Sequence, residues 1–425
     1  MLQLSCDTLI IKERNFIVTM DYSKFNNICQ HISDSYSDED IDFSTELVDI
    51  NEQTNKSRNW KARKQENIYL AEAYSQIDER KALNLLYCAN RLGFDVDFDD
   101  KKHLAEVSFC RVRLCPICAW RRSMRLFADN MRIVDYIDNN DVVVKKECKR
   151  KYKTKSGYKT KTKVVEKTFK KHTINYILVT LTVRNCFGDK LSSTIDEMFN
   201  AFHNFIRLEQ FSEWIGYVKH FEVTHNTDVY KCKYLYFKDS NNPKRKLKKK
   251  VYVLDDDGNK IPNDCFDTYH PHIHLLVAVR QSYFKSKNYV SKDRLRELWA
   301  DCLHITDEEY RKHLQVSIDA CRGSSYQSVA EVSKYASKSN DYVIKSDWDL
   351  TIDTVRTLDA VLAGRRLVTY SGIFNVVKKI LKINDVEKAD LVHIEDDEQE
   401  QLPENIAYRD YYWWHFGYGQ YYKLK

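Results

Sequence analysis

The sequence predicts an α+β protein in which helices flank a central antiparallel sheet and a helical region with a cysteine cluster precedes that sheet. Two observations lead to this class. Segments rich in β-branched residues alternate with segments of helical periodicity between residues 126 and 345, a pattern typical of α+β folds. Upstream of them, four cysteines lie between Cys88 and Cys118 with the close spacing of metal ligands.

Shifts in composition along the 425 residues indicate more than one folded unit, since a chain of this length exceeds the usual size of one compact domain. The expected division is an acidic leader without a strong pattern at 1–59, a helical region with the cysteine knuckle at 60–125, the main α+β domain at 126–345, a second helical region at 346–384, and an acidic linker with an aromatic tail at 385–425.

Local periodicity predicts the individual elements. Helices are expected at 60–91 (two helices), 119–138, 191–214, 291–303, 327–339 and 353–381. Strands are expected at 176–183, 216–225 and 271–279, and a hairpin at 251–259 has its turn at Asp255–Asn259. The end of the chain, 408–422, is crowded with Tyr and Trp, which we expect to pack on the core rather than to stack on bases.

The composition favours a folded protein of the cytoplasm. Hydrophobic residues make up 43% of the chain, and the low counts of Gly (10) and Pro (5) argue against a low-complexity sequence. No apolar stretch reaches the length of a membrane span, and residues 1–18 carry charges where a signal peptide has its apolar region. In a reducing compartment the 12 cysteines are expected as thiols or metal ligands rather than as disulfides.

Charge is distributed unevenly, although the net charge is only +6. Asp34–Glu52 contains eight acids and no Lys or Arg, whereas Lys145–Lys171 contains thirteen Lys or Arg and two Glu. A second basic run, which begins Lys244, Arg245, Lys246, is interrupted only by Leu247. One such run is most often a solvated hairpin or loop, but two runs near the same strands favour contact with a nucleic-acid backbone.

The cysteine segment has the spacing of a structural zinc site. Cys110, Cys115 and Cys118 lie within nine residues, Pro116 stiffens the turn, and Cys88 can complete a tetrahedral set, with His103 as the alternative fourth ligand. Buried free thiols or a redox pair are the other interpretations, and the second lacks a thioredoxin-like context. Arginines surround the segment, so we expect DNA contacts from three of them, Arg113, Arg121 and Arg122.

A histidine pair on a strand forms the second candidate site. Alternate residues of a strand face the same side, so His272 and His274 present two imidazoles together while Ile273 points into the core; His270 lies at the mouth of the strand, where Pro271 marks its start. Glu222, on the strand expected at 216–225, is the best candidate for a third ligand. An added carboxylate favours Mg²⁺ or Mn²⁺ acting on phosphates, although a hydrogen-bonded pair without metal is about equally common.

A helix expected at 327–339 carries the third candidate site. Glu331 and Tyr335 are four residues apart and share a helix face, and Lys338 lies beside it. A tyrosine hydroxyl can attack phosphorus when its proton is removed and the phosphate is polarised. With 28 tyrosines in the chain, spacing alone does not distinguish Tyr335 from Tyr326 or Tyr342.

Taken together, these segments resemble the rolling-circle replication initiators of plasmids from Gram-positive bacteria, single-tyrosine members of the HUH endonuclease class. The resemblance covers roughly residues 60–380. It rests on Leu178–Thr182, on His270-Pro271-His272-Ile273-His274, on Glu331-Val332-Ser333-Lys334-Tyr335-x2-Lys338, on the cysteine segment, and on Ala363–Gly372. Lys145–Lys171 and Tyr230–Asp267 resemble insertions relative to a minimal member, which leaves the placement of Glu222 open.

The resemblance implies the roles of these residues. His272 and His274, with Glu222 as the expected third ligand, would hold catalytic Mg²⁺ or Mn²⁺, and the four cysteines would hold structural Zn²⁺. Tyr335 would nick origin DNA, single-stranded or in a hairpin, to give a 5′-phosphotyrosine and a free 3′-OH primer. Glu331 would activate water at termination. Host helicase and DNA polymerase would be the partners, and the oligomeric state is not implied.

Two rival functions fit some of the same features. A transposase of the HUH class shares the chemistry, whereas a conjugative relaxase usually has its histidine motif after the nucleophile. A DNA-binding regulator without catalysis would use only the cysteine knuckle and the basic runs. The regulator predicts binding without cleavage and no effect of Tyr335→Phe.

Overall fold

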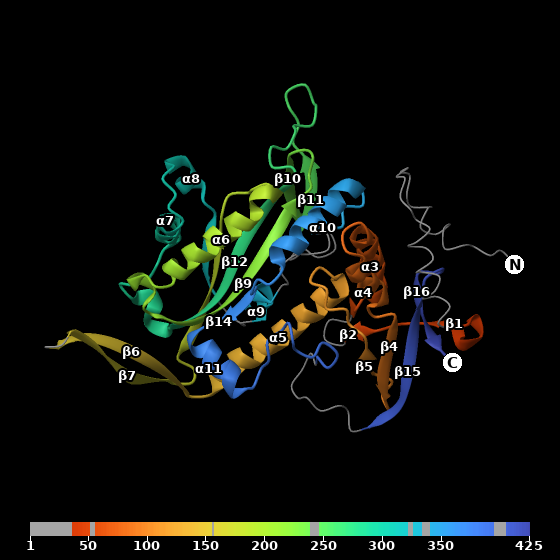
Figure 1. Ribbon diagram of the computed structural model, residues 1–425, viewed down its shortest axis with the longest axis horizontal. Coiled ribbons are helices and arrows are strands. Elements are labelled where there is room, and N and C mark those ends of the chain that lie inside the picture. Colours follow the sequence, from red (N-terminus) through yellow and green to blue (C-terminus); the bar gives the residue numbers. More distant parts are fainter. Residues whose placement is uncertain are drawn as a thin grey trace.

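Two five-stranded antiparallel sheets organise the part of the chain described by the computed structural model, which comprises residues 36–51, 56–154, 157–238, 246–321, 326–333, 341–394 and 405–425 (Figure 1). The first sheet has the order β13-β8-β12-β9-β14 and the second the order β1-β16-β15-β4-β5. The expectation of an α+β fold built on antiparallel sheets is confirmed.

The first sheet carries the histidine segment on its central strand. Its members are β8 (Ile174–Thr182), β9 (Trp214–Asn226), β12 (Thr268–Arg280), β13 (Val316–Ala320) and β14 (Val368–Tyr370). The expected strands at 176–183, 216–225 and 271–279 are all present and are longer than predicted. Because β12 lies between β8 and β9, side chains on both of its faces are held in a fixed register.

Helices cover both faces of this sheet. One face packs against α6 (Gly188–Phe205), α7 (Lys292–Cys302) and α10 (Trp348–Leu362), through odd-numbered residues of β12 such as Leu275 and Val277. The other packs against α5 (Pro116–Asn139), α9 (Tyr326–Val332) and α11 (Gly372–Ile380), through even-numbered residues such as Leu276 and Ala278. His272 and His274 belong to the even-numbered series.

The second sheet joins the two ends of the described chain. It combines β1 (Ile41–Glu46), β4 (Arg91–Asp97), β5 (Lys102–Val107), β15 (Ile406–His415) and β16 (Gln420–Leu424), beside α3 (Trp60–Ser75) and α4 (Glu79–Tyr87). Trp414 and Tyr421 are almost fully buried, so the aromatic tail packs in a core, as expected. This sheet crosses the boundaries that composition indicated at residues 59 and 385.

Two helical predictions differ in their bounds. The helix expected at 191–214 ends at Phe205, because Phe205, Phe211 and Trp214 pack ring against ring and turn the chain into β9. The helical region expected at 353–381 is α10 and α11 with the short strand β14 between them. Of the helix expected at 327–339, the described part is α9, and residues 334–340 lie outside the described residues.

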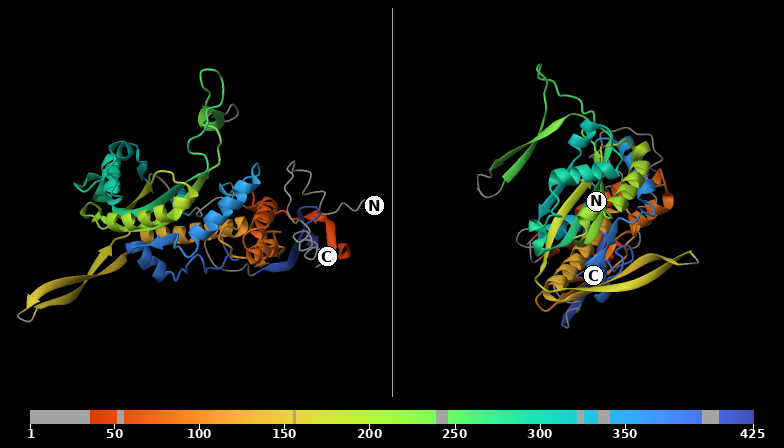
Figure 2. Two further views of the ribbon diagram at one scale, coloured as in Figure 1. Left: turned by 45° about the horizontal axis from the view of Figure 1, so that its top comes forward. Right: turned by 90° about the vertical axis from the view of Figure 1, so that its left-hand side faces the viewer.

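Two hairpins stand off the body (Figure 2). One is β6 (Val142–Thr154) with β7 (Gly157–Phe169), which contains most of the first basic run; the other is β10 (Cys232–Lys238) with β11 (Lys246–Tyr252). The predicted turn at Asp255–Asn259 is present just after β11, closed by a backbone hydrogen bond from Asp255 to Asn259.

The remaining short elements are β2 (Ile50–Asn51), β3 (Lys56–Ser57), α8 (Glu308–His313) and the 3-10 turns Asp38–Asp40, Glu209–Phe211 and Gln281–Lys285. Within the described ranges, no helix is both long and apolar enough to cross a lipid bilayer.

Candidate active site and cysteine cluster

The paired histidines lie side by side on one face of β12. The ring centroids of His272 and His274 are 5.9 Å apart and the rings are almost parallel, at 11°. Ile273 points to the opposite face and is fully buried, as predicted. The strand alternation of this segment therefore places two imidazoles together.

Glu222 lies directly beside this pair. Its partner across β9 and β12 is His272, and its Oε2 is 3.3 Å from Nε2 of His274. Glu222 is 4% exposed. The insertion at Tyr230–Asp267 enters the connection between β9 and β12 without disturbing the register at Glu222, so the structure brings together the three residues selected from the sequence.

Pro271 lies inside β12 rather than at its start, since the strand begins at Thr268. β12 pairs with β8 only from His272 onward, so at Pro271 the strand is paired with β9 alone. Proline has no N–H to donate, and it is tolerated at a position where one side of the strand is unpaired. His270 is consequently a strand residue, half-buried, with its ring centroid 4.4 Å from that of His272.

The protonation of His272 favours metal binding. Burial, with a smaller contribution from His270, lowers the pKa of His272 to about 4, although the charge of Glu222 opposes this. The imidazole is therefore neutral at physiological pH, the form that coordinates metals. Its Nδ1 is buried and has no hydrogen-bond partner among the described residues, which leaves that atom available to a ligand.

Thr180 orients the second histidine. Its hydroxyl lies 3.1 Å from Nδ1 of His274, on the neighbouring strand β8. A hydrogen bond at one ring nitrogen fixes the orientation of the ring and directs the other nitrogen, here toward Glu222. His220, which the strand pattern alone did not single out, is a further member of this face: it pairs with His274 across the sheet and is fully buried. His220 is two residues before Glu222 on the same strand, and this alternation places both side chains on one face.

The residue types of this set, two imidazoles and a carboxylate, are those that bind a divalent ion in an open site. Two imidazoles and a carboxylate leave positions for water or a phosphate oxygen, and such mixed sets bind catalytic divalent ions. Within the described residues, the four cysteines are the one group of three or more candidate ligands whose donor atoms lie close enough together to hold a single ion. The histidine site is thus a set of donors from two strands rather than a closed metal shell.

Helix α9 covers the same face of the sheet as the histidines. Val329 and Val332 are fully buried and pack with residues of β9 and β12, and the end of the helix is held by a hydrogen bond of 3.0 Å from Asn130 of α5 to Ser333. Glu331 belongs to this helix and is half-buried. Tyr335 and Lys338 lie outside the described residues.

The four cysteines form a compact cluster at the start of α5. Their sulfur atoms all lie within 4.8 Å of one another, and the group can hold a metal ion such as zinc. Cys88 is the C-cap of α4, Cys110 follows β5, Cys115 is the N-cap of α5, and Cys118 lies in the first turn of α5. His103, the alternative fourth ligand, instead contacts Asp97 at 3.1 Å.

Backbone amides donate to three of the four sulfurs, and the pKa shifts of the thiols differ in direction. The N–H groups of Cys110, Arg111 and Cys118 donate to the sulfurs of Cys88, Cys118 and Cys115 respectively, at 3.3–3.4 Å. Burial raises the pKa of Cys88 and Cys115. Burial also acts to raise the pKa of Cys118, but hydrogen bonds within the cluster and the charge of Arg122 outweigh it and lower that pKa.

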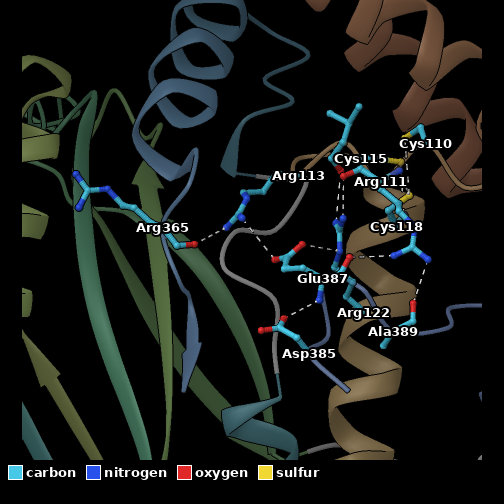
Figure 3. Close-up of polar contacts among 11 residues, drawn as sticks. Cys110, Arg111, Arg113, Cys115, Cys118, Arg122, Arg365, Asp385, Glu387 and Ala389 are labelled. Carbon is cyan, nitrogen blue, oxygen red and sulfur yellow. Dashed lines mark hydrogen bonds and ion pairs between the residues drawn. The ribbon is translucent and has the colours of Figure 1, made fainter. Parts of the chain in front are cut away.

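The arginines around the cluster bind the C-terminal segment 385–394 rather than solvent (Figure 3). The carboxylate of Glu387 lies 3.6 Å from Arg113 and 3.4 Å from Arg122, and Arg111 donates to the carbonyls of Glu387 and Ala389. Arg121 donates to the carbonyls of Leu391 and Val392 in the same segment.

The expectation that Arg121 and Arg122 contact DNA directly is contradicted by this arrangement. The two residues are 2% and 1% exposed, and their donors are directed at protein carbonyls and at Glu387. They fasten the acidic segment to the cysteine cluster instead. Of the other basic residues selected from the sequence, Lys246 begins β11, whereas Lys244 and Arg245 lie outside the described residues.

Comparison with known proteins gives a consistent family. A family model described as "Replication protein" matches residues 145–422. A protein named "Protein rep" from Bacillus amyloliquefaciens is 29% identical over 388 residues, which cover 86% of this chain and 93% of that protein. A "Protein rep" from a Bacillus species is 30% identical, and the match covers 74% of this chain and 85% of that protein. A "Protein rep" from Lentilactobacillus hilgardii is 26% identical, and the match covers 84% of this chain and 93% of that protein. No solved structure matches the chain.

Proposed function

Since the chain belongs to the replication protein family, we propose that it initiates rolling-circle replication of a plasmid by nicking one strand of the origin. The observation that carries this proposal is the pairing of Glu222 with His272 beside His274, on the sheet face covered by α9. It assembles a metal-type donor set next to the helix that leads toward Tyr335.

The metal centre would consist of His272, His274 and Glu222. Mg²⁺ or Mn²⁺ bound there would polarise the scissile phosphate. The protein prepares the site in two ways: burial keeps His272 neutral, and Thr180 orients His274. The two central strands fix the spacing of the donors before any ion or DNA arrives, which is the preorganisation that catalysis requires.

Tyr335 would be the nucleophile. Its hydroxyl oxygen forms the new bond to phosphorus, its proton passes to a solvent base, and the bond from phosphorus to the 3′ oxygen breaks to give a protonated 3′-OH. Lys338 would favour the phenolate and the phosphate together. The phosphotyrosine conserves the phosphodiester bond for later transfer, and the 3′-OH primes synthesis by host polymerase after a host helicase is recruited.

Glu331 would act at termination, because a carboxylate four residues before Tyr335 in the chain is placed to activate a water molecule. The second phosphodiester would then be hydrolysed, which stops the reaction without a second tyrosine. The cysteine cluster would hold structural Zn²⁺, since four thiolates form a closed site. The basic run Lys244, Arg245 and Lys246 would contact the DNA backbone.

A covalent adduct tests the nicking activity. The purified chain is incubated with single-stranded oligonucleotides from the origin of its own replicon and Mn²⁺ or Mg²⁺, and a DNA–protein band that survives denaturation is measured. We expect the adduct with wild type and none with Tyr335→Phe. Tyr418→Phe, at an exposed position in the turn between β15 and β16, is the matched control and retains the adduct.

Two results would contradict the assignment. An adduct formed by Tyr335→Phe means that another residue is the nucleophile. Cleavage by His272→Ala at the wild-type rate in the same metal means that the histidine site is not the metal centre. Binding of the origin without any adduct in wild type supports the regulator without catalysis.

A further inference from the structure

The β10–β11 ribbon is placed at the candidate active site by the chain itself. Glu222 lies four residues before the end of β9, and His272 lies four residues after the start of β12. The ribbon is inserted into the connection between these two strands, so its base lies at the end of the sheet that carries the metal-type donors. It projects from the body in the right-hand view of Figure 2.

One face of the ribbon is a row of tyrosines and lysines. In an antiparallel pair, residues directly opposite each other share a face. The opposed pairs Tyr236↔Lys248, Tyr234↔Lys250 and Cys232↔Tyr252 therefore lie on one face, ordered from the tip of the ribbon toward its base. The tyrosines on this face are 48%, 69% and 50% exposed at positions 234, 236 and 252.

The tyrosine row continues below the ribbon toward the sheet. The ring of Tyr230 meets that of Tyr252 edge to face at 6.0 Å, and the ammonium of Lys260 lies 4.1 Å from the centroid of Tyr252 and 5.3 Å from that of Tyr230. Lys248 lies 4.8 Å from the centroid of Tyr234. Aromatic faces and ammonium groups thus alternate along the ribbon down to its base.

Packing within the protein does not account for this surface. Among the described residues the ribbon is a separate two-stranded sheet, and exposed apolar side chains also occur on its other face, where Leu235 is 48% and Phe237 is 47% exposed. A two-stranded ribbon is only marginally stable by itself, so large exposed rings on it are costly unless a ligand covers them. The tyrosines indicate a partner.

The charge of the ribbon selects an anionic partner. The two strands contain six lysines and no acid, at positions 233, 238, 246, 248, 249 and 250. Lys250 is paired with Asp228 at 2.5 Å, at the foot of the ribbon. Flat aromatic rings interleaved with ammonium groups match single-stranded nucleic acid, whose exposed bases stack on rings while its phosphates contact the lysines. A duplex offers phosphates and base edges but no free base faces.

We propose that the Tyr234–Tyr236 face of the β10–β11 ribbon is a stacking platform for the single-stranded DNA that enters the site at His272. This inference rests on the proposed function for the identity of the DNA, but the platform itself requires no cleavage. The strand lies along the tyrosine row, with bases on Tyr234 and Tyr236 and phosphates near Lys248, and the sheet end at Glu222 and His272 receives the phosphate to be cut.

Binding of single strands by the full chain tests the platform. Fluorescence anisotropy with a labelled 15-nucleotide oligo-dT, in buffer without added Mg²⁺ or Mn²⁺, gives the dissociation constant. The double variant Tyr234→Leu/Tyr236→Leu is expected to bind about tenfold more weakly or worse, because stacking contributes on the order of 1–3 kcal/mol per base. Tyr234→Phe/Tyr236→Phe keeps the rings and is expected to bind within about twofold of wild type, on the same principle.

Tyr408→Leu is the matched control. Tyr408 is 49% exposed on a strand of the second sheet, with Lys423 5.7 Å from its ring, and its loss is expected to leave binding unchanged. Wild-type affinity in the Leu double variant overturns the platform. Equal weakening for a 15-base-pair duplex also overturns it, because it indicates a contact to double-stranded DNA or to phosphates alone.

The covalent adduct assay separates this inference from the proposed function. Loss of single-strand binding in the Leu double variant, with no adduct in wild type under any metal, supports the platform and rejects nicking. Adduct formation in wild type together with unchanged binding in the Leu double variant supports nicking and rejects the platform.

Discussion

The carboxylate of Glu222 lies 3.3 Å from Nε2 of His274, although the residue directly opposite Glu222 on the neighbouring strand is His272. The carboxylate therefore reaches diagonally across the ladder and lies beside both imidazoles. This relationship requires the register between β9 and β12 to be exact, because a shift of one residue would send Glu222 to the opposite face of the sheet.

Glu222→Gln should reduce cleavage while preserving the fold, because glutamine matches glutamate in size but is a poorer ligand for a hard divalent ion. At subsaturating Mn²⁺ we expect a loss of at least about tenfold in adduct formation, the lower end of what even an outer-shell partner contributes. The rate is measured across a Mn²⁺ titration. Glu106→Gln, on an exposed position of β5, is the control, and equal rates in the two variants would remove Glu222 from the metal site.

Thr180→Val should weaken metal binding without removing a ligand. The substitution keeps the size and shape of the side chain and deletes the hydroxyl that lies 3.1 Å from Nδ1 of His274. Partners of this kind contribute about 10- to 100-fold in metal affinity, so the Mn²⁺ concentration for half-maximal cleavage should rise by that factor. Thr180→Ser restores the hydroxyl and should restore the affinity. If Thr180→Ser behaves like Thr180→Val, the effect comes from packing and not from the hydrogen bond.

Cys115→Ser should remove the bound metal from the knuckle and destabilise the protein. The sulfur of Cys115 is one of four that lie within 4.8 Å of one another, and it also accepts the N–H of Cys118 at the start of α5. We expect one equivalent of zinc per wild-type chain by elemental analysis, little in the variant, and a lower melting temperature for the variant. Cys265→Ser, at an exposed cysteine, should keep both. Wild-type protein purified without zinc, and insensitive to a chelator, would contradict a metal knuckle.

The sequence predicted those parts of the site that depend on local pattern. The alternation around Ile273 placed His272 and His274 on one face, and the spacing of Cys110, Cys115 and Cys118 indicated a cluster, because both follow from neighbours along the chain. Glu222 required the pairing of two strands separated by the β10–β11 ribbon, and its selection rested on residue type.

The parts that the sequence did not predict depend on contacts distant in the chain. Arg121 and Arg122 had the composition of a DNA-binding surface, but segment 385–394 covers them, more than 260 residues later. Likewise, the acidic Ile41–Glu46 and the aromatic Ile406–His415 lie in one sheet, with β16 between them, although they are separated by most of the chain. Charge and hydrophobicity describe a residue but not which distant segment covers it.

Lys219 provides a prediction for the pH dependence of stability. It lies on the face of β9 opposite to Glu222, 7% exposed, with its ammonium 4.1 Å from the ring centroid of Phe199, and burial lowers its pKa to about 8 from an ordinary value of 10.5. Because the folded protein binds this proton less tightly than the unfolded chain, the free energy of unfolding should rise as the pH increases from about 8 to 10.5. Below pH 8 the full cost of the buried charge is present.

Lys219→Met removes this charge but keeps a long apolar side chain. The variant should therefore be more stable than wild type at pH 7, by up to about 3 kcal/mol, less whatever the contact with Phe199 contributes. The difference should shrink toward zero at pH 10. Urea unfolding of both proteins at pH 7, 8.5 and 10 measures the two curves, and other groups that titrate cancel in the difference. If the difference in the free energy of unfolding between the two proteins is the same at every pH, then Lys219 keeps an ordinary pKa in the folded protein. The burial of its charge would then not destabilise the fold.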